Sequence, residues 1–279
     1  MGLKVKNAQP HFYLHHAQTA APDPKDFESH CHAYYELIYV VQGRGSYIVE
    51  GTAYPLLPNT VLLLAPYEYH YVCPDQDCPY ERYVLNFDAD TPFDTGRTLA
   101  PFAKEESVTG RGVYFPSERV DAALRHGFCT FDTLERFLEP SDATLTSEGE
   151  ILFRSTLTQL LLLLTSSYTA PVALPPRNLV SDVIAYINAN LSSPLSLEEL
   201  SRRFFVSKYH LCRAFRQSTG TTLLSYVTTK RVVLAKQLME NGEAATEAAY
   251  RVGFREYSSF YRAYRKQTGH APAWERQGE

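Results

Sequence analysis

Residues 212–220 have the sequence CRAFRQSTG and residues 261–269 have the sequence YRAYRKQTG, so one nine-residue motif occurs twice at an offset of 49. A match at a fixed offset indicates an internal repeat of one structural unit. Because only two short copies are present, a solenoid is not expected. The C-terminal part of the chain is therefore predicted to be built on a duplicated unit.

The residues around the first copy predict a helix, a tight turn and a second helix. Ser196 and Glu199 have the spacing of a capping box, and residues 197–204 carry apolar side chains at helical spacing. Ser207 is placed to cap a second helix, which we expect to end at Gly220. This order and spacing are typical of a helix-turn-helix unit.

The second copy follows the same plan, with helices predicted over residues 246–252 and 256–268 and a turn at Gly253. Between the copies, residues 223–239 contain neither Gly nor Pro and predict a linker helix. Such a helix is about 25 Å long. It can place two recognition helices in neighbouring faces of the major groove, which are about 34 Å apart along a duplex.

The second helix of each unit is predicted to present a polar outer face to double-stranded DNA. Arg213 and Arg262 occupy matching positions, and an arginine can bind guanine through two hydrogen bonds. Hydroxyl and amino groups on the same face can bind base edges or phosphates. For a single copy, an ordinary solvated helix is an equally good explanation, but matched arginines in two copies favour DNA. The predicted DNA-binding residues are Lys208, Tyr209, Cys212, Arg213, Arg216, Tyr257, Ser258, Tyr261, Arg262 and Arg265.

The distribution of charge supports a polyanionic partner for the C-terminal region only. From residue 177 onward there are 15 basic and 9 acidic residues, a net charge of +6. The first 176 residues hold 12 basic and 22 acidic residues, a net charge of −10. A basic region on an otherwise acidic chain favours nucleic acid as its partner.

Residues 179–276 resemble the DNA-binding domain of AraC/XylS-type transcription regulators. The resemblance is carried by LSLEELSRRFFVSKYHLCRAFRQSTG at residues 195–220 and by EAAYRVGFREYSSFYRAYRKQTG at residues 247–269. It implies that the base-facing positions are Tyr209, Cys212 and Arg213 in the first unit and Tyr257, Ser258, Tyr261 and Arg262 in the second. Two departures, Ala248 and the ending GHAPAWER, concern the core and the end of the domain.

The first 116 residues are predicted to form an N-terminal arm and a β-barrel. Residues 1–28 have the composition of a polar arm, and many short strand-like segments separated by Gly and Pro follow them. His30, His32, Tyr34 and Glu36 would share one face of a strand, and His70 would come from another strand. We therefore expect these five residues to lie close together.

The spacing His-x-His, three residues, Glu, six residues, Gly at positions 30–43 resembles the first motif of cupin barrels, with His70 as the second-motif histidine. Pro58-Asn59-Thr60 stands where that family has Pro-x-Gly in its second motif, and ten residues separate Asn59 from His70. Three roles remain open: a divalent metal site formed by His30, His32, Glu36 and His70, an effector-binding site without metal that includes Tyr34, and purely structural hydrogen bonding. Tyr34, Tyr39, Tyr47 and Tyr54 suit stacking on a sugar ring, although tyrosine is also common in strands.

Residues 117–169 change to helical periodicity, with a long apolar stripe over residues 148–166. This stripe could be core, but we expect it to mediate formation of a homodimer. Residues 170–177, APVALPPR, predict a semi-rigid linker before a DNA-binding domain at residues 178–279.

Together these features predict a two-domain α+β protein: a cupin-type β-barrel followed by helices, then an all-α domain with two helix-turn-helix units joined by a linker helix. The predicted function is a cytoplasmic, sequence-specific transcription regulator that senses a small effector such as a sugar, with RNA polymerase as a further partner. No residues indicate a catalytic site, a cofactor other than a divalent metal, or a membrane span. The alternative is a metal-dependent cupin enzyme that carries a DNA-binding domain.

Overall fold

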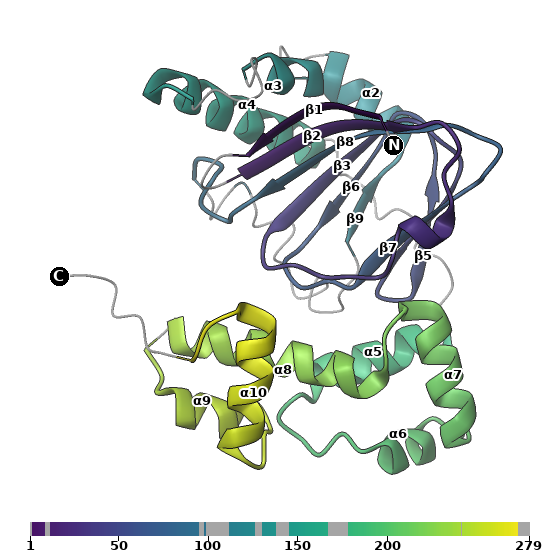
Figure 1. Ribbon diagram of the computed structural model, residues 1–279, viewed down its shortest axis with the longest axis vertical. Coiled ribbons are helices and arrows are strands. Elements are labelled where there is room, and N and C mark those ends of the chain that lie inside the picture. The colour runs from purple at the N-terminus through teal and green to yellow at the C-terminus, as the bar shows by residue number, and fades with distance from the viewer. Residues whose placement is uncertain are drawn as a thin grey trace. The chain divides into compact units, whose positions relative to one another are not determined.

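The computed structural model of this chain describes residues 2–8, 12–94, 98, 112–125, 130–137, 145–166, 178–240 and 242–272. The chain divides into two compact units, Met1–Pro176 and Arg177–Glu279 (Figure 1). The linker predicted at residues 170–177 lies outside the described residues. Among the described helices, none has the length and apolar character needed to cross a membrane.

The first unit contains two antiparallel sheets. The larger has the strand order β1-β2-β8-β3-β6-β9 and the smaller has the order β5-β4-β7. The strands are β1 (Gly2–Ala8), β2 (Phe12–Thr19), β3 (Tyr35–Gln42), β4 (Gly45–Val49), β5 (Thr52–Leu56), β6 (Thr60–Leu64), β7 (His70–Pro74), β8 (Tyr80–Phe87) and β9 (Val113–Phe115). The predicted β-rich N-terminal domain is confirmed, with its strands divided between two sheets.

The prediction of a polar arm over residues 1–28 is wrong for much of that segment. Strand β2 pairs with β8 along its whole length, from Phe12↔Phe87 to Thr19↔Tyr80, and β1 pairs with β2. Phe12 and Leu14 are buried because alternate side chains of β2 enter the core. Tyr13, which lies between them, occupies the other face of the strand.

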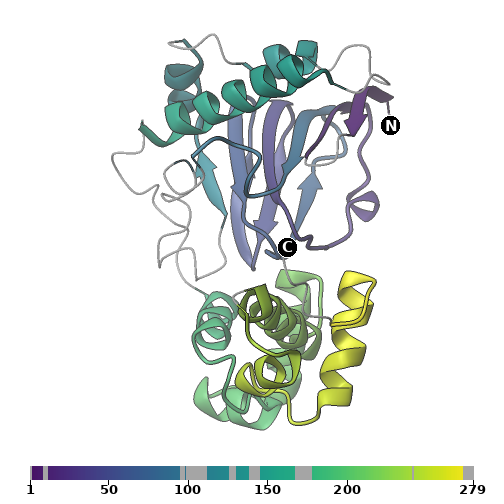
Figure 2. The ribbon, with the colours of Figure 1, turned by 90° about the vertical axis from the view of Figure 1, so that its left-hand side faces the viewer.

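The two faces of the larger sheet are covered by different layers. One face packs against the smaller sheet through a core that includes Ile38, Val49, Leu56, Leu64 and Tyr80. The other face is covered by the helices α2 (Ser117–Arg125), α3 (Phe131–Phe137) and α4 (Ser147–Ser166) (Figures 1 and 2). The first unit is therefore a three-layer arrangement of small sheet, large sheet and helices.

Helix α4 divides the apolar stripe expected for dimer formation into two parts. Phe153, Leu157, Leu160, Leu161 and Leu164 are fully buried in the core beneath the larger sheet, and the Phe153 ring stacks on Phe12 with centroids 3.9 Å apart. Ile151, Leu152 and Leu162 are exposed on the opposite side, at 55%, 51% and 44%. Much of the stripe is thus core of this chain, and only its remainder faces outward.

The second unit is entirely helical in its described residues. Its helices are α5 (Leu179–Ala189), α6 (Leu197–Arg203), α7 (Lys208–Thr219), α8 (Leu223–Glu240), α9 (Ala245–Arg251) and α10 (Tyr257–Thr268). The side chains of Ser196 and Ser207 accept hydrogen bonds from the Glu199 and His210 amides, as expected for helix caps. The two predicted helix-turn-helix units, α6–α7 and α9–α10, and the linker helix α8 are confirmed.

Helix α8 joins the two helix-turn-helix units by burying a different side in the core of each. Its first half buries Leu223, Tyr226 and Val227, whereas its second half buries Val232, Ala235 and Met239. Successive residues are about 100° apart around a helix, so these two sets lie on different sides of the rod. The single helix therefore belongs to the cores of both units.

Arg231 adds a polar connection between the two halves. It donates hydrogen bonds to the carbonyl oxygens of Leu191 and Ser193, at 2.9 and 2.8 Å, in the connection from α5 to α6. On its other side lies Gly253, in the turn of the second helix-turn-helix unit, with a φ of 96°. A Cβ at this position would come within 2.7 Å of the Leu191 oxygen and 2.9 Å of the Arg231 guanidinium. Glycine is needed here both for the positive φ and for the close approach.

Candidate functional site

A cavity of about 430 Å³ opens in the β-rich unit beside the inner face of the larger sheet. Its lining comes from β2, β3, β4, β7 and β8 and from the segment around the short 3-10 helix η1 (Pro24–Asp26). This volume is within the range of small-molecule sites in proteins. All five predicted effector-binding residues line the cavity: His30, His32, Tyr34, Glu36 and His70.

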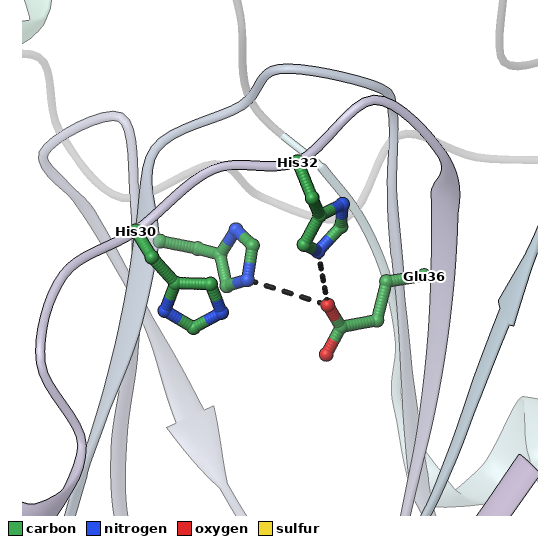
Figure 3. A group of neighbouring side chains, drawn as sticks. His30, His32 and Glu36 are labelled. Atoms are coloured by element: carbon green, nitrogen blue, oxygen red, sulfur yellow. Dashed lines mark hydrogen bonds and ion pairs between the residues drawn. The ribbon is translucent and has the colours of Figure 1, made fainter. Parts of the chain in front are cut away.

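Four of these residues converge on one point. The ligand atoms of His30, His32, Glu36 and His70 all lie within 4.8 Å of one another. The Glu36 carboxylate contacts His32 Nε2 through a hydrogen bond and lies 3.4 Å from His70 Nε2 (Figure 3). The Tyr34 ring stacks on His32 with centroids 4.1 Å apart and an interplanar angle of 11°.

Two backbone features position the histidines. His30 and His70 form an isolated β-bridge, with N···O distances of 3.1 and 3.0 Å, that places their rings 4.4 Å apart. His32 lies between this bridge and the start of β3 at Tyr35. The expectation that His30, His32 and Glu36 share one regular strand is therefore wrong, although the side chains still meet.

The electrostatics of the cluster favour an ionised glutamate. Burial alone would raise the pKa of Glu36, but the hydrogen bonds from His32 and His70 outweigh it and hold the pKa below the usual range. Burial would lower the pKa of His70, but the Glu36 carboxylate outweighs this effect and raises it. Burial and the neighbouring His70 lower the pKa of His30. Imidazoles and a carboxylate grouped in this way can bind a divalent cation or hydrogen-bond a polar ligand.

The structure adds cavity residues that the sequence did not single out. Arg82, Tyr80 and Asn86 line the cavity from β8, and His15 and Thr19 line it from β2. In β8, Tyr80, Arg82, Val84 and Asn86 share one face because side chains alternate along a strand. The sequence therefore did contain a sign of this cavity residue: the charged Arg82 shares a strand face with Tyr80 and Val84.

The tyrosines considered for sugar stacking divide into two groups. Tyr34 and Tyr47 line the cavity. Tyr39 stacks on Phe131 on the helix-covered face of the larger sheet, with centroids 4.7 Å apart. Tyr54 stacks on Tyr114 in the core between the sheets. Only the first pair is placed to contact a ligand in this cavity.

Helix α7 presents a basic outer face in the second unit. Lys208, Tyr209, Cys212, Arg213 and Arg216 are all exposed, with 75% of Tyr209 accessible. Lys208 forms an ion pair with Glu198 of α6. The opposite face of α7 buries Leu211 and Phe215.

Helix α10 has a similar division. Ser258, Tyr261, Arg262 and Arg265 are exposed, whereas Phe260 and Tyr264 are buried. Tyr257 differs from the expectation of a fully exposed residue, because it is half-buried and its ring lies 5.7 Å from that of Phe260. Each of α7 and α10 carries three basic side chains and no acidic one. Within the described part of the chain, Arg213 and Arg262 form no hydrogen bond or ion pair.

Comparison with known protein families agrees with this division into a ligand-binding and a DNA-binding part. Residues 13–200 match the family of AraC-like ligand binding domains, and residues 200–277 match a helix-turn-helix domain family. The chain belongs to the AraC family. It is an effector-sensing, DNA-binding transcription regulator with the two-part architecture of that family.

Individual AraC-family relatives are similar over most of their length. The chain is 27% identical over 256 residues to the HTH-type transcriptional activator RhaS of Escherichia coli O1:K1 / APEC, covering 91% of this chain and 88% of RhaS. It is 26% identical over 277 residues to RhaS of Klebsiella pneumoniae (strain 342), covering 96% and 95%. Among solved structures, ToxT from Vibrio cholerae O395 matches with a TM-score of 0.38 and 12% identity, covering 95% of this chain and 96% of ToxT.

Proposed function

We propose that the chain binds a bipartite DNA operator through the outer faces of α7 and α10, and that a small effector in the β-rich cavity controls this binding. The observation that carries the proposal is the matched composition of the two helices, each with three exposed basic side chains and no acidic one. Two such helices joined by one linker helix are expected to enter successive turns of the major groove. Selection of binding sequences from random duplexes tests it, because enrichment of one bipartite sequence is expected.

The exposed residues divide into proposed base and phosphate contacts. We assign Tyr209, Cys212, Arg213, Ser258, Tyr261 and Arg262 to base edges, since they project from the outer faces. Lys208, Arg216 and Arg265 are assigned to phosphates. Tyr257 has a restricted role, because its ring packs on Phe260 and only its exposed edge can approach DNA.

The cavity is proposed to bind the effector without chemical turnover. Hydroxyl, imidazole and amide groups from β2, β4, β7 and β8 and from the segment before β3 converge in it, which suits a polyhydroxylated molecule such as a sugar. The matched relatives are transcriptional activators, which supports binding rather than catalysis. We also propose that the chain recruits RNA polymerase, as a transcriptional activator would, and that it is located in the cytoplasm with the DNA.

The histidine and glutamate cluster is proposed to hold a divalent transition-metal ion. Three imidazole nitrogens and one carboxylate oxygen within 4.8 Å of one another fit the donor set that such ions prefer. When bound, the ion would act as a Lewis acid toward oxygen atoms of the effector. His30, His32, Glu36 and His70 would hold it, and Tyr34 would fix the His32 ring by stacking.

Metal binding can be tested directly by titration calorimetry with Ni²⁺, Zn²⁺ and Mn²⁺. We expect one ion per chain, and His70→Ala is expected to weaken binding by about 100-fold or more, because it removes a ligand that is already in place. His15→Ala is the matched control, because His15 lines the same cavity but is outside the cluster. Failure of all three ions to bind would remove both the metal proposal and the alternative of a metal-dependent enzyme.

A homodimer through the exposed side of α4 is also proposed. Ile151, Leu152, Ser155, Gln159 and Leu162 recur at helical spacing on this side, and none carries a charge. A symmetric pair of such helices would bury the exposed leucines against each other. A dimer would place four helix-turn-helix units on one operator.

The double substitution Leu152→Glu and Leu162→Glu is expected to dissociate the dimer, raising its dissociation constant by about tenfold or more, because it places unpaired like charges in the interface. Sedimentation velocity measures this directly. Leu57→Glu is the control, since Leu57 is a similarly exposed leucine, at 46%, outside α4. An unchanged dimer in the double variant would show that α4 is not the interface.

A further inference from the structure

Arg82 is a buried cation at the cavity. Its residue is only 5% exposed, and it lines the cavity from β8. Its Nη1 donates a hydrogen bond to Thr19 Oγ1 at 3.0 Å, and its guanidinium carbon lies 4.5 Å from the centroid of the Tyr80 ring and 5.6 Å from that of Phe27. A guanidinium group has five N–H donors, so most of its hydrogen-bonding capacity remains available.

No carboxylate of the described residues forms an ion pair with Arg82. The adjacent Glu81 points to the other face of the sheet, where it contacts His16 at 2.8 Å. Glu36, the buried carboxylate of the cavity, is held by His32 and His70. Burying a charge without an ionic partner is costly, and the two aromatic rings compensate only part of that cost. Asp26 and Glu28 also line the cavity, but they are exposed and form no ion pair with Arg82 within the described residues. Arg82 therefore holds a positive charge without an ion-pair partner next to an open volume.

The register of the larger sheet places Arg82 on the same side as Glu36 but at a distance. Arg82 pairs with Val40 and Asn86 pairs with Glu36, so the two charged residues lie four positions apart along neighbouring strands. Four positions correspond to about 13 Å along a strand. This offset separates backbone positions, and a ligand that contacts both regions meets different chemistry at its two ends.

Tyr47 and Tyr80 line the same cavity. Their hydroxyl groups contact each other, and each interacts electrostatically with both Arg82 and Glu36. Burial raises the pKa of Tyr80 to about 12 and raises that of Tyr47 well above its usual value, so both remain neutral at physiological pH. Neither tyrosine can thus supply the missing negative charge, while both can hydrogen-bond a bound molecule.

We propose that the effector carries an anionic group, a carboxylate or a phosphate, which pairs with Arg82 while its other end reaches the His30, His32, Glu36 and His70 cluster. The proposal rests on the proposed role of this cavity as the effector site and narrows the effector class. A sugar acid or a sugar phosphate fits, whereas a neutral sugar leaves Arg82 without its partner. An arginine binds either anion through two parallel hydrogen bonds.

The test compares the full-length wild type with Arg82→Met by thermal unfolding, after metal has been removed and the chelator dialysed away. The probes are acetate, its uncharged analogue acetamide, and inorganic phosphate, each compared with chloride at equal ionic strength. At about 100 mM, acetate or phosphate is expected to raise the unfolding temperature of wild type by about 2 °C more than that of Arg82→Met. Acetamide is expected to affect the two proteins equally.

Two further variants complete the test. Arg44→Met is the matched control, because Arg44 is an exposed arginine of the same unit that pairs with Asp75 and Asp77, and we expect it to respond like wild type. Arg82→Lys keeps the charge, so it is expected to retain a response to the anions even if Arg82→Met does not fold. A response to acetate alone would indicate a carboxylate, and a response to phosphate alone would indicate a phosphate.

Equal responses of wild type and Arg82→Met to acetate and phosphate would overturn the proposal, as would loss of the anion response in Arg44→Met. The proposed function is tested separately, by the affinity of the same proteins for a selected operator. If wild type binds no operator specifically, the proposed recognition of a bipartite operator by α7 and α10 is overturned while the anion result stays intact. Specific DNA binding by wild type without an Arg82-dependent anion response would overturn the anion proposal and leave the DNA-binding proposal intact.

Discussion

The double substitution Arg213→Ala and Arg262→Ala is expected to lower operator affinity by roughly 100-fold or more, since each arginine that binds a guanine contributes about 1–3 kcal/mol of discrimination. Each single substitution should relax sequence preference at one half-site only. The physical reason is that both side chains are exposed on the outer faces of α7 and α10 and form no competing ion pair within the described residues. They are free to bind base edges without breaking an internal contact.

Fluorescence anisotropy at one fixed salt concentration, with the operator and a scrambled duplex, measures this effect. Binding to the scrambled duplex should fall much less, because it depends mainly on phosphate contacts. Arg251→Ala is the control, because it removes the same charge from α9, where Arg251 pairs with Glu243. If wild type and all variants bind every duplex equally, α7 and α10 are not the recognition helices.

Phe215→Ala is expected to destabilise the DNA-binding unit by about 3–5 kcal/mol, the usual cost of removing a buried phenylalanine. Phe215 is fully buried on the inner face of α7, and its ring meets Tyr226 of α8 edge-on with centroids 5.4 Å apart. The substitution would leave a cavity between α7 and the linker helix. Operator binding should then be lost although no DNA contact is removed.

Phe205→Ala is the matched control for this experiment. Phe205 is 95% exposed in the turn between α6 and α7, so its loss should change stability by less than about 0.5 kcal/mol. Urea unfolding followed by circular dichroism compares the two variants under identical conditions. Equal destabilisation by both would mean that α7 is not packed against α8 through Phe215.

The DNA-binding unit was largely predictable because its signals are local. Ser196 and Ser207 cap helices that begin at the next residue, and Gly220 and Gly269 end α7 and α10 with φ values of 72° and 83°. The spacing of Leu211 and Phe215 identified the buried face of α7. Two features were not predicted: helix α5, which is capped by Asn178, and the half-burial of Tyr257, which depends on packing against Phe260 in three dimensions.

The β-rich unit was less predictable because its strands pair over long sequence separations. Strand β2 belongs to the larger sheet through β8, which lies more than 60 residues further on, and the histidines within β2 obscured its buried alternation. The short strand β9 pairs with β6 and was not predicted. The His-x-His motif located one end of the cavity, but Arg82 became a candidate only when the register of β8 against β3 was known.

The contact of Arg231 with Leu191, Ser193 and Gly253 has a consequence for operator architecture. We infer that these contacts restrict the separation and the angular phase of the two helix-turn-helix units. In the proposed complex, adding one base pair between the two contacted segments shifts the second by about 3.4 Å and turns it by about 35° around the duplex. A protein that does not adjust by that amount must distort the DNA instead, so we expect operator affinity to depend on the number of intervening base pairs as well as on the bases that are contacted.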